Sequence, residues 1–298
     1  MQGVQGVCER DPQKTIAERL QQRFDELTRA ERQLAGSLLE NYPVSGLSSI
    51  TAVAAQAGVS TPTVVRMVQK LGFRGFPEFQ AELRRELGER ISNPIDKHDT
   101  WAAKAPDQHI LNRFTEAVIG NIRQTLAQVD TASFDAVADL LADTAHGVHV
   151  VGGRITRALA DYLFLHMQVV RPGVSLIQSL ANAWPHDLLN MAPGDVLVVF
   201  DVRRYENATL KLAEMARGQG ARIVLFTDQW GSPVAAHADH VLSCRIAVPS
   251  AWDSNVVLML LLETVLAAVQ ERTWAQTRER MERLESMFDK TRLFRKFT

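Results

Sequence analysis

The chain has 298 residues, of which 46% are hydrophobic and 22% charged, a mix typical of a globular protein long enough for two domains. Its 33 basic and 34 acidic residues leave a net charge of −1, which excludes a general attraction to nucleic acids or membranes, so any such affinity must be local. The chain has two cysteines, Cys8 in a tail and Cys244, which exclude a disulfide framework and a cysteine zinc site. We see no secretory signal and no apolar run long enough to span a bilayer, so we expect a cytoplasmic protein without a membrane partner.

Residues 14–90 carry only helical signals. Thr28 stands three residues before Glu31, the spacing of a capping box, in which two side chains satisfy the first free N–H groups of a helix. Apolar residues then recur at helical spacing as far as Pro43, which ends this helix. We therefore predict an all-α amino-terminal domain.

A short helix, a tight turn and a second helix follow, which is the layout of a helix-turn-helix. Ser48 or Ser49 caps the first helix, Gly58 breaks it, and Ser60 caps the second. On the second helix an apolar stripe must face the core, and polar side chains are expected together on the opposite side. The stripe is Val64, Val68 and Leu71, and the polar side is Thr63, Arg66 and Lys70.

The span 41–77 contains no Asp or Glu, so we expect its cations to have no carboxylate nearby. Each Lys or Arg that meets the DNA backbone releases counterions, whereas a carboxylate is repelled. A solvated helix face that happens to be basic is the alternative, but the cap, the turn and the missing acids together favour a DNA-reading surface. The expected contacts are Ser49, Ser60, Thr61, Thr63, Arg66, Lys70 and Arg74, with Arg66 at a base edge or phosphate.

Residues 91–109 are polar, contain prolines and are interpreted as a linker. A helical hairpin follows from residue 110, and short apolar strands then alternate with helices. This alternation predicts an α/β domain over residues 110–277, with a doubly wound, five-stranded parallel sheet and ligand chemistry at the carboxyl ends of its strands. The expected strands are 148–152, 174–177, 195–200, 222–227 and 240–244. A last helix or tail, 278–298, offers Met281, Leu284, Met287 and Phe288 to a partner subunit.

The segment "LSSITAVAAQAGVSTPTVVRMVQKLGFRGFPEFQAEL" closely resembles the amino-terminal domain of the RpiR/MurR family of bacterial transcriptional regulators. The second half looks like the SIS domain of that family, a sugar-isomerase-type sheet that senses phosphorylated sugars. The resemblance covers nearly the whole chain. It implies a homodimer or homotetramer that binds palindromic double-stranded DNA and is controlled by a metabolite, with no cofactor.

Two loops depart from the family's pattern. After the first strand, Gly152 and Gly153 are adjacent, and Arg154 follows. After the third strand, a Ser-x-Ser-Gly-x-Thr loop is replaced by one that carries Arg203 and Arg204, whose guanidiniums bind planar anions in bidentate fashion. We expect an anionic ligand, a carbohydrate derivative or a carboxylate. The expected contacts are Gly152, Gly153, Arg154, Thr156, Asp201, Arg203, Arg204, Tyr205, Thr227 and Ser254.

Several residues keep a second interpretation. Arg203 or Arg204 can instead pair with Asp201, Glu206 or Asp228 and only brace the loop, and Ser254 can cap a helix. Trp184 either walls the site or fills core, and His166 is expected as a packed core histidine.

Three functions compete: a ligand-responsive regulator of a catabolic operon, a sugar-phosphate isomerase, and a sheet domain that only dimerises. We favour the first and expect no enzyme activity, because bulky arginines replace the hydroxyl loop and no residues have metal-ligand or Ser–His–Asp spacing.

Overall fold

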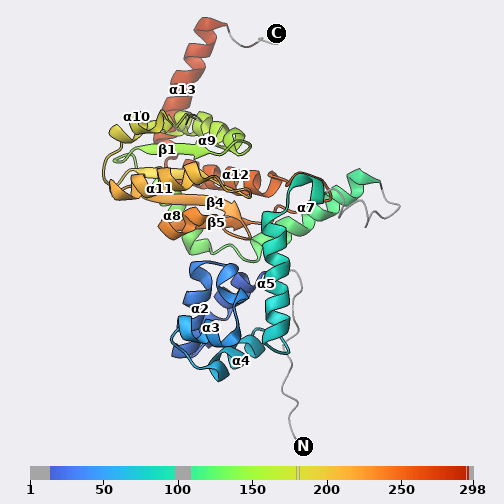
Figure 1. Cartoon of the computed structure of the whole chain (residues 1–298). Helices are drawn as coiled ribbons and strands as arrows, with labels where there is room; N and C mark the ends of the chain where they lie inside the picture. The colour runs from blue at the N-terminus through green and yellow to red at the C-terminus, as the bar shows by residue number, and fades with distance from the viewer. Residues whose placement is uncertain (1–13, 98–108, 179, 181, 293, 295–298) are drawn as a thin grey trace, which may run out of the picture. The chain divides into compact units, whose positions relative to one another are not determined.

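The computed structural model describes residues 14–97, 109–178, 180, 182–292 and 294, and the chain divides into two compact units between residues 92 and 93 (Figure 1). The predicted tail with Cys8, most of the predicted linker and the last residues of the chain lie outside the described residues. None of the helices in the described ranges is long and apolar enough to cross a bilayer.

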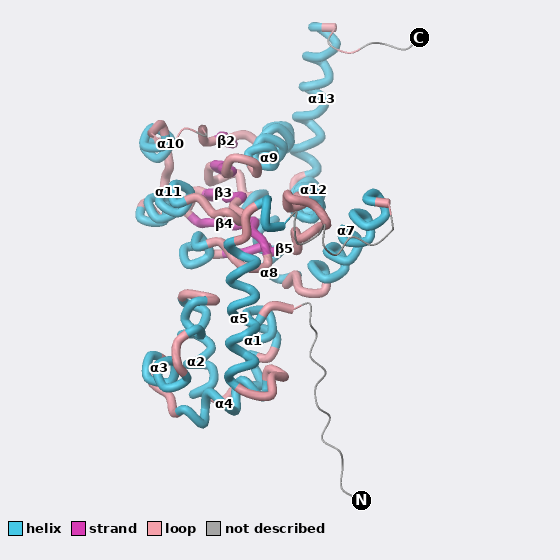
Figure 2. Tube along the Cα trace, turned by 45° about the vertical axis from the view of Figure 1, so that its right-hand side comes forward, coloured by secondary structure: helices cyan, strands magenta, loops and turns pink. Residues whose placement is uncertain are grey.

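Unit 1 consists of helices and loops (Figure 2). The capping box of Thr28 and Glu31 is present at the start of the second helix, as predicted, and a further box of Thr15 and Glu18 begins the first. The elements are α1 Ile16–Gln22, η1 Phe24–Glu26, α2 Arg29–Glu40, η2 Val44–Leu47, α3 Ile50–Gln56, α4 Thr61–Lys70 and α5 Phe76–Ile91.

The core of unit 1 gathers one apolar stripe from each of its longer helices, and the predicted stripe of α4 is buried. Gly46 lets η2 approach α5, because a Cβ at this position would lie 2.4 Å from Leu83 Cδ1. Complete burial of one aliphatic side chain stabilises the folded state by roughly 1.5–3 kcal/mol, so this core holds α3 and α4 in a fixed orientation relative to each other. Core members include Leu34, Leu38, Val53, Ala54, Val64, Met67, Val68 and Phe79.

Unit 2 contains the predicted sheet, whose five strands are all parallel in the order β2-β1-β3-β4-β5. The strands are β1 Val148–Gly152, β2 Val174–Leu176, β3 Val196–Phe200, β4 Arg222–Asp228 and β5 His240–Cys244. The helices are α7 Ile110–Leu126, α8 Thr131–Ala142, α9 Arg157–Val170, α10 Trp184–Leu189, α11 Asn207–Gly218, η3 Pro233–His237, α12 Val256–Arg272 and α13 Trp274–Thr291.

Helices cover both faces of the sheet, as the prediction of a doubly wound domain requires. Alternate residues of β3 enter two separate cores: Val196 and Val198 pack with α8, α9 and α12, whereas Leu197 and Val199 pack with α10 and α11. Register places Gly152 opposite Phe200 at the carboxyl ends of β1 and β3. The loops after these two strands therefore lie side by side.

Part of the predicted linker is helical, since residues 94–97 form a helical turn. The Asn93 side chain accepts hydrogen bonds from the N–H groups of Ile95 and Asp96, and Pro94 takes the first helical position. This Asn-Pro pair was the local signal of a helix start within the polar segment.

His166 is exposed, so the prediction of a packed core histidine was wrong. The face of α9 that carries His166 also carries Leu165, which is 61% exposed, and the imidazole instead stacks on Tyr162 with ring centroids 4.4 Å apart. The core-facing residues of α9 are on its other side.

The stability of unit 1 should fall as pH rises from about 4.5 to 8. Glu86 is fully buried on α5, where its carboxylate accepts hydrogen bonds from the Ile16 N–H and the Tyr42 hydroxyl, and burial raises its pKa from 4.5 to about 8. Below pH 4.5 the folded and unfolded chains both hold this proton. Between the two values only the folded chain does, so raising the pH favours unfolding.

Glu86→Gln should flatten this part of the pH profile, whereas the exposed Glu40→Gln should leave it unchanged. All five tryptophans lie beyond residue 92, so helix loss by circular dichroism without a tryptophan fluorescence change reports unit 1. An equal pH slope in wild type and Glu86→Gln would contradict the assignment.

Candidate functional site

The turn between α3 and α4 is built from local signals in the sequence. Ser49 caps α3 by accepting a hydrogen bond from the Ala52 N–H at 3.2 Å, and Gly58 adopts φ +62 in the turn. Ser60 holds the N-cap position of α4 but makes no side-chain bond to the helix backbone. Its hydroxyl bonds the Thr63 hydroxyl at 2.9 Å instead.

Thr63 is 6% exposed, so its predicted place on the outer face of α4 was wrong. It precedes Met67 by one helical turn and therefore shares the side of that fully buried residue. Thr61 is only half-buried at the start of the helix and stays accessible.

Lys70 is paired with a carboxylate, contrary to the expectation that no acid lies near these cations. Its Nζ lies 2.7 Å from Glu31 Oε2 and also reaches the Glu26 carbonyl. Burial raises the pKa of the Glu31 carboxyl, but hydrogen bonds from Lys70 and Thr28 outweigh this effect and leave the pKa lowered. An acid-free span in the sequence is therefore not an acid-free surface, because α2 supplies the carboxylate.

Arg66 and Arg74 remain as exposed cations at this surface. The guanidinium of Arg66 makes one weak hydrogen bond, to the Thr63 hydroxyl at 3.4 Å, and the Arg74 side chain pairs with no other described residue. Gln69, which sequence reasoning missed, is exposed three residues after Arg66. The spacing of three residues between Arg66 and Gln69 places both on the same side of α4, and this spacing could have identified Gln69 from the sequence.

In unit 2, Gly152 and Gly153 bring the backbone of the β1–α9 loop close to its neighbours. A Cβ on Gly152 would lie 2.5 Å from the Thr156 carbonyl oxygen, and a Cβ on Gly153 would lie 3.0 Å from Glu206 Oε1. The buried Thr156 hydroxyl donates to the Phe200 carbonyl at 2.7 Å, so it joins this loop to the end of β3. The Thr156 hydroxyl, which we predicted to contact the ligand, is therefore already hydrogen-bonded within the protein.

Arg203 is held by Asp253 and is 4% exposed at its side chain. Nε lies 2.9 Å from Asp253 Oδ2 and Nη2 lies 2.7 Å from Oδ1, while the guanidinium stacks over the Trp230 ring at 4.0 Å. The bracing interpretation thus describes this arginine, with Asp253 in place of the carboxylates considered from the sequence. Lys97 Nζ contacts the same carboxylate at 2.5 Å.

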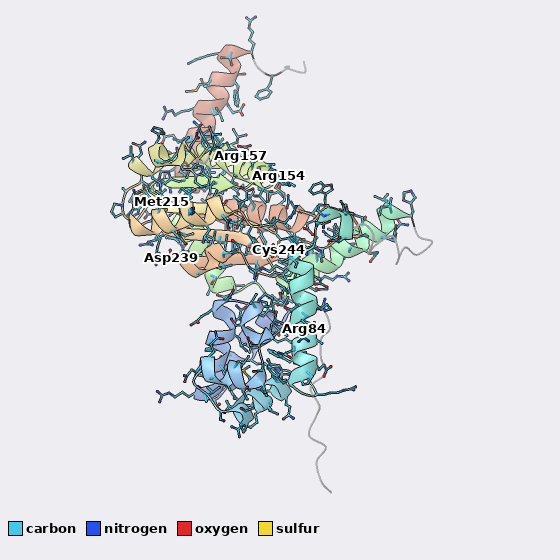
Figure 3. The ribbon with its side chains drawn as sticks, viewed as in Figure 1. Arg84, Arg154, Arg157, Met215, Asp239 and Cys244 are labelled. Atoms are coloured by element: carbon cyan, nitrogen blue, oxygen red, sulfur yellow. The ribbon has the colours of Figure 1, made fainter. Side chains whose placement is uncertain are left out.

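Arg154 and Arg204 differ from Arg203, because both are exposed and neither guanidinium pairs with a side chain in the part of the chain that the structure describes. Arg154 lies on the loop after β1 (Figure 3), and Arg204 follows β3 in the sequence and lies on the loop after that strand. The site therefore offers two cations where the sequence predicted three.

Buried carboxylates brace the loop after β3. Asp228 accepts hydrogen bonds from the Arg203 N–H, the Trp230 N–H and the Tyr205 hydroxyl, and burial raises its pKa. Asp201 accepts from Ser232, and burial raises its pKa to about 7.

Two further predicted contacts are buried hydroxyls. Thr227 donates to the Asp201 carbonyl at 2.7 Å, and Ser254 accepts from the N–H of Val256, the first residue of α12, at 3.3 Å, while Asn255 holds the N-cap position of this helix. Trp184 belongs to the core beneath α10 and α11. No cluster of three His, Cys, Asp or Glu side chains within the described ranges could hold a metal ion.

Family comparisons match both units. Residues 14–90 match the helix-turn-helix domain of the rpiR family, and residues 143–268 match the SIS domain. The HTH-type transcriptional regulator HexR of Pseudomonas aeruginosa is 25% identical over 293 residues, covering 94% of this chain and 97% of that protein. HexR of Escherichia coli is 24% identical, covering 92% and 96%.

Solved structures agree on the fold. The sugar isomerase domain of an RpiR transcription factor from Sphaerobacter thermophilus superposes with a TM-score of 0.55 at 25% identity, covering 59% of this chain and 97% of that chain. The Vibrio vulnificus NanR protein complexed with ManNAc-6P has a TM-score of 0.51 at 14% identity, covering 92% and 98%.

Asp253→Asn should destabilise unit 2, because it leaves the buried Arg203 guanidinium and Lys97 without their shared carboxylate. Loss of one partner of a buried pair costs about 3 kcal/mol. Glu282→Gln, which breaks the exposed pair with Arg278, should cost less than about 1 kcal/mol. Denaturant unfolding followed by tryptophan fluorescence reports unit 2, and equal losses in the two variants would show that the Asp253 pair is no stronger than a surface pair.

Proposed function

Because the chain belongs to the RpiR family of transcriptional regulators, with a helix-turn-helix domain followed by a SIS domain, we propose that it binds a palindromic operator in double-stranded DNA under the control of a small anionic metabolite. Residues 14–90 contact DNA and residues 110–277 bind the metabolite. Such a regulator works in the cytoplasm and controls a catabolic operon.

The exposed guanidinium of Arg66 on α4 carries the DNA proposal. The second helix of a helix-turn-helix enters the major groove, where an arginine can donate two hydrogen bonds to guanine. Lys70 is less available, since leaving Glu31 would strand a buried carboxylate. Arg74 and Thr61 are accessible for backbone contacts.

The unpaired guanidiniums of Arg154 and Arg204 support an anionic effector at the carboxyl ends of β1 and β3, where parallel sheets bind ligands. NanR binds ManNAc-6P and another fold neighbour is a sugar isomerase domain, which supports a carbohydrate derivative as the effector. The relatives that match nearly the whole chain are transcriptional regulators, which weighs against the alternative of a sugar-phosphate isomerase.

We also propose that a second copy of the chain packs against the apolar stripe of α13. Met281, Leu284 and Phe288 follow one another at intervals of three and four residues and are only partly buried, and α13 projects away from the sheet in both views (Figures 1 and 2). Acidic and basic side chains alternate beside this stripe, as Glu282, Arg283 and Glu285 do, so two such helices can pair without net repulsion. A two-fold dimer matches a palindromic operator.

Arg66→Ala should weaken operator binding by roughly 10- to 100-fold at fixed salt, the loss expected for a bidentate base contact. The operator is first selected from a random duplex library with the wild-type chain, and binding is measured by fluorescence anisotropy. Arg84→Ala is the matched control, because Arg84 is an exposed α5 arginine with no side-chain partner among the described residues (Figure 3). Equal binding by Arg66→Ala and Arg84→Ala would count against α4 as the reading helix.

Leu284→Glu should shift the chain from dimer to monomer, because it places a carboxylate in the apolar stripe of each α13. Light scattering coupled to size-exclusion chromatography measures the mass. Ser286→Glu adds the same charge at an exposed position off the stripe and should leave the mass unchanged. A dimer that persists in Leu284→Glu would place the interface elsewhere.

A further inference from the structure

A carboxylate of the chain itself binds a backbone N–H of the loop that connects β1 with α9. Glu206, which immediately precedes α11, reaches across to this loop, where its Oε1 accepts the Arg154 N–H at 2.8 Å. Gly153 makes room for it, since a Cβ there would lie 3.0 Å from the same oxygen. A backbone N–H after a parallel strand is a common place for the acid group of a ligand.

Other backbone donors of the neighbouring loop are also taken by carboxylates of this chain. The Glu206 N–H hydrogen-bonds Asp201, and the Arg203 N–H donates to Asp228 at 2.7 Å. The guanidiniums of Arg154 and Arg204 are different, because they lie exposed and pair with no other described side chain. Two exposed arginines thus lie on the same pair of adjacent loops as the Arg154 N–H, a backbone donor that Glu206 already occupies.

Glu206 is the carboxylate that can leave most readily. Asp201 and Asp228 are 2% and 0% exposed, and each is held by the loop from several sides. Glu206 is exposed at the edge of α11 and holds the Arg154 N–H through one oxygen. Its side chain can swing into solvent without uncovering a buried charge.

We propose that Glu206 is a displaceable stand-in for the effector: the acid group of the ligand, a carboxylate or a phosphate, takes its place on the Arg154 N–H and pairs with the guanidiniums of Arg154 and Arg204. This inference rests on the proposed effector site. It makes Glu206 a specificity-determining residue, because a simple anion must compete with a carboxylate tethered at the site. Only a ligand that makes further contacts displaces it.

Removal of the competitor should reveal binding of simple anions. The full chain is titrated calorimetrically with inorganic phosphate and, separately, with malonate, as wild type, Glu206→Ala and Glu206→Gln. We expect the Kd of at least one anion to fall tenfold or more in Glu206→Ala, and to fall less in Glu206→Gln, whose amide oxygen can still accept the Arg154 N–H. A gain for phosphate alone assigns the acid group as a phosphate, and a gain for malonate alone assigns it as a carboxylate.

Glu214→Ala is the matched control. It removes one exposed carboxylate from the same helix at a distance from the loop, where Glu214 faces His237, and should bind both anions as wild type does. Adding Arg154→Ala to Glu206→Ala should abolish the gain. The inference is overturned if neither Glu206 variant binds either anion more tightly than wild type, or if Glu214→Ala gains as much.

These outcomes are separable from the failure of the proposed function. Anion binding is measured without DNA, so a chain that gains phosphate binding through Glu206→Ala but never binds a duplex contradicts the regulator and keeps the stand-in. A chain that binds DNA, but whose Glu206 variants gain no anion affinity, supports the regulator and contradicts the role of Glu206 as a stand-in for the effector.

Discussion

Internal carboxylates decide which cations of this chain remain available to an external polyanion. In unit 1, Glu31 holds Lys70, and in unit 2, Asp253 holds Arg203. Breaking either pair would leave a largely buried charge without its partner, which costs more than a surface contact returns. Among the described residues of the two candidate sites, the arginines that pair with no carboxylate are Arg66 and Arg74 in unit 1 and Arg154 and Arg204 in unit 2. A chain with a net charge of −1 can therefore present two local cationic sites.

The same pairing fixes the loop after β3. Asp253 binds the Arg203 guanidinium through both oxygens and also contacts Lys97, which belongs to the short helical turn that follows unit 1 in the sequence. One carboxylate thus holds both the loop after β3 and the first residues of unit 2. A ligand that moved Arg203 would leave Lys97 as the remaining basic partner of Asp253 in this group of three.

Local signals predicted much of the fold, whereas contacts between distant residues set the site. The capping box of Thr28 and the five strands of the sheet were predicted because caps, helical spacing and strand–helix alternation depend on residues that are close together in the sequence. The Lys70–Glu31 and Arg203–Asp253 pairs join residues 39 and 50 positions apart, and no local pattern encodes them. The error at Thr63 came from assigning a helix face by polarity, when its spacing from Met67 places it inward.

Equilibrium binding of the full chain to duplex DNA over a range of salt concentrations tests most directly whether unpaired cations make this nearly neutral chain a DNA-binding protein. We predict a measurable association constant whose logarithm falls linearly with the logarithm of salt concentration, with a slope of about −0.9 for each phosphate contacted. Binding that ignores salt, or no binding at low salt, would contradict it.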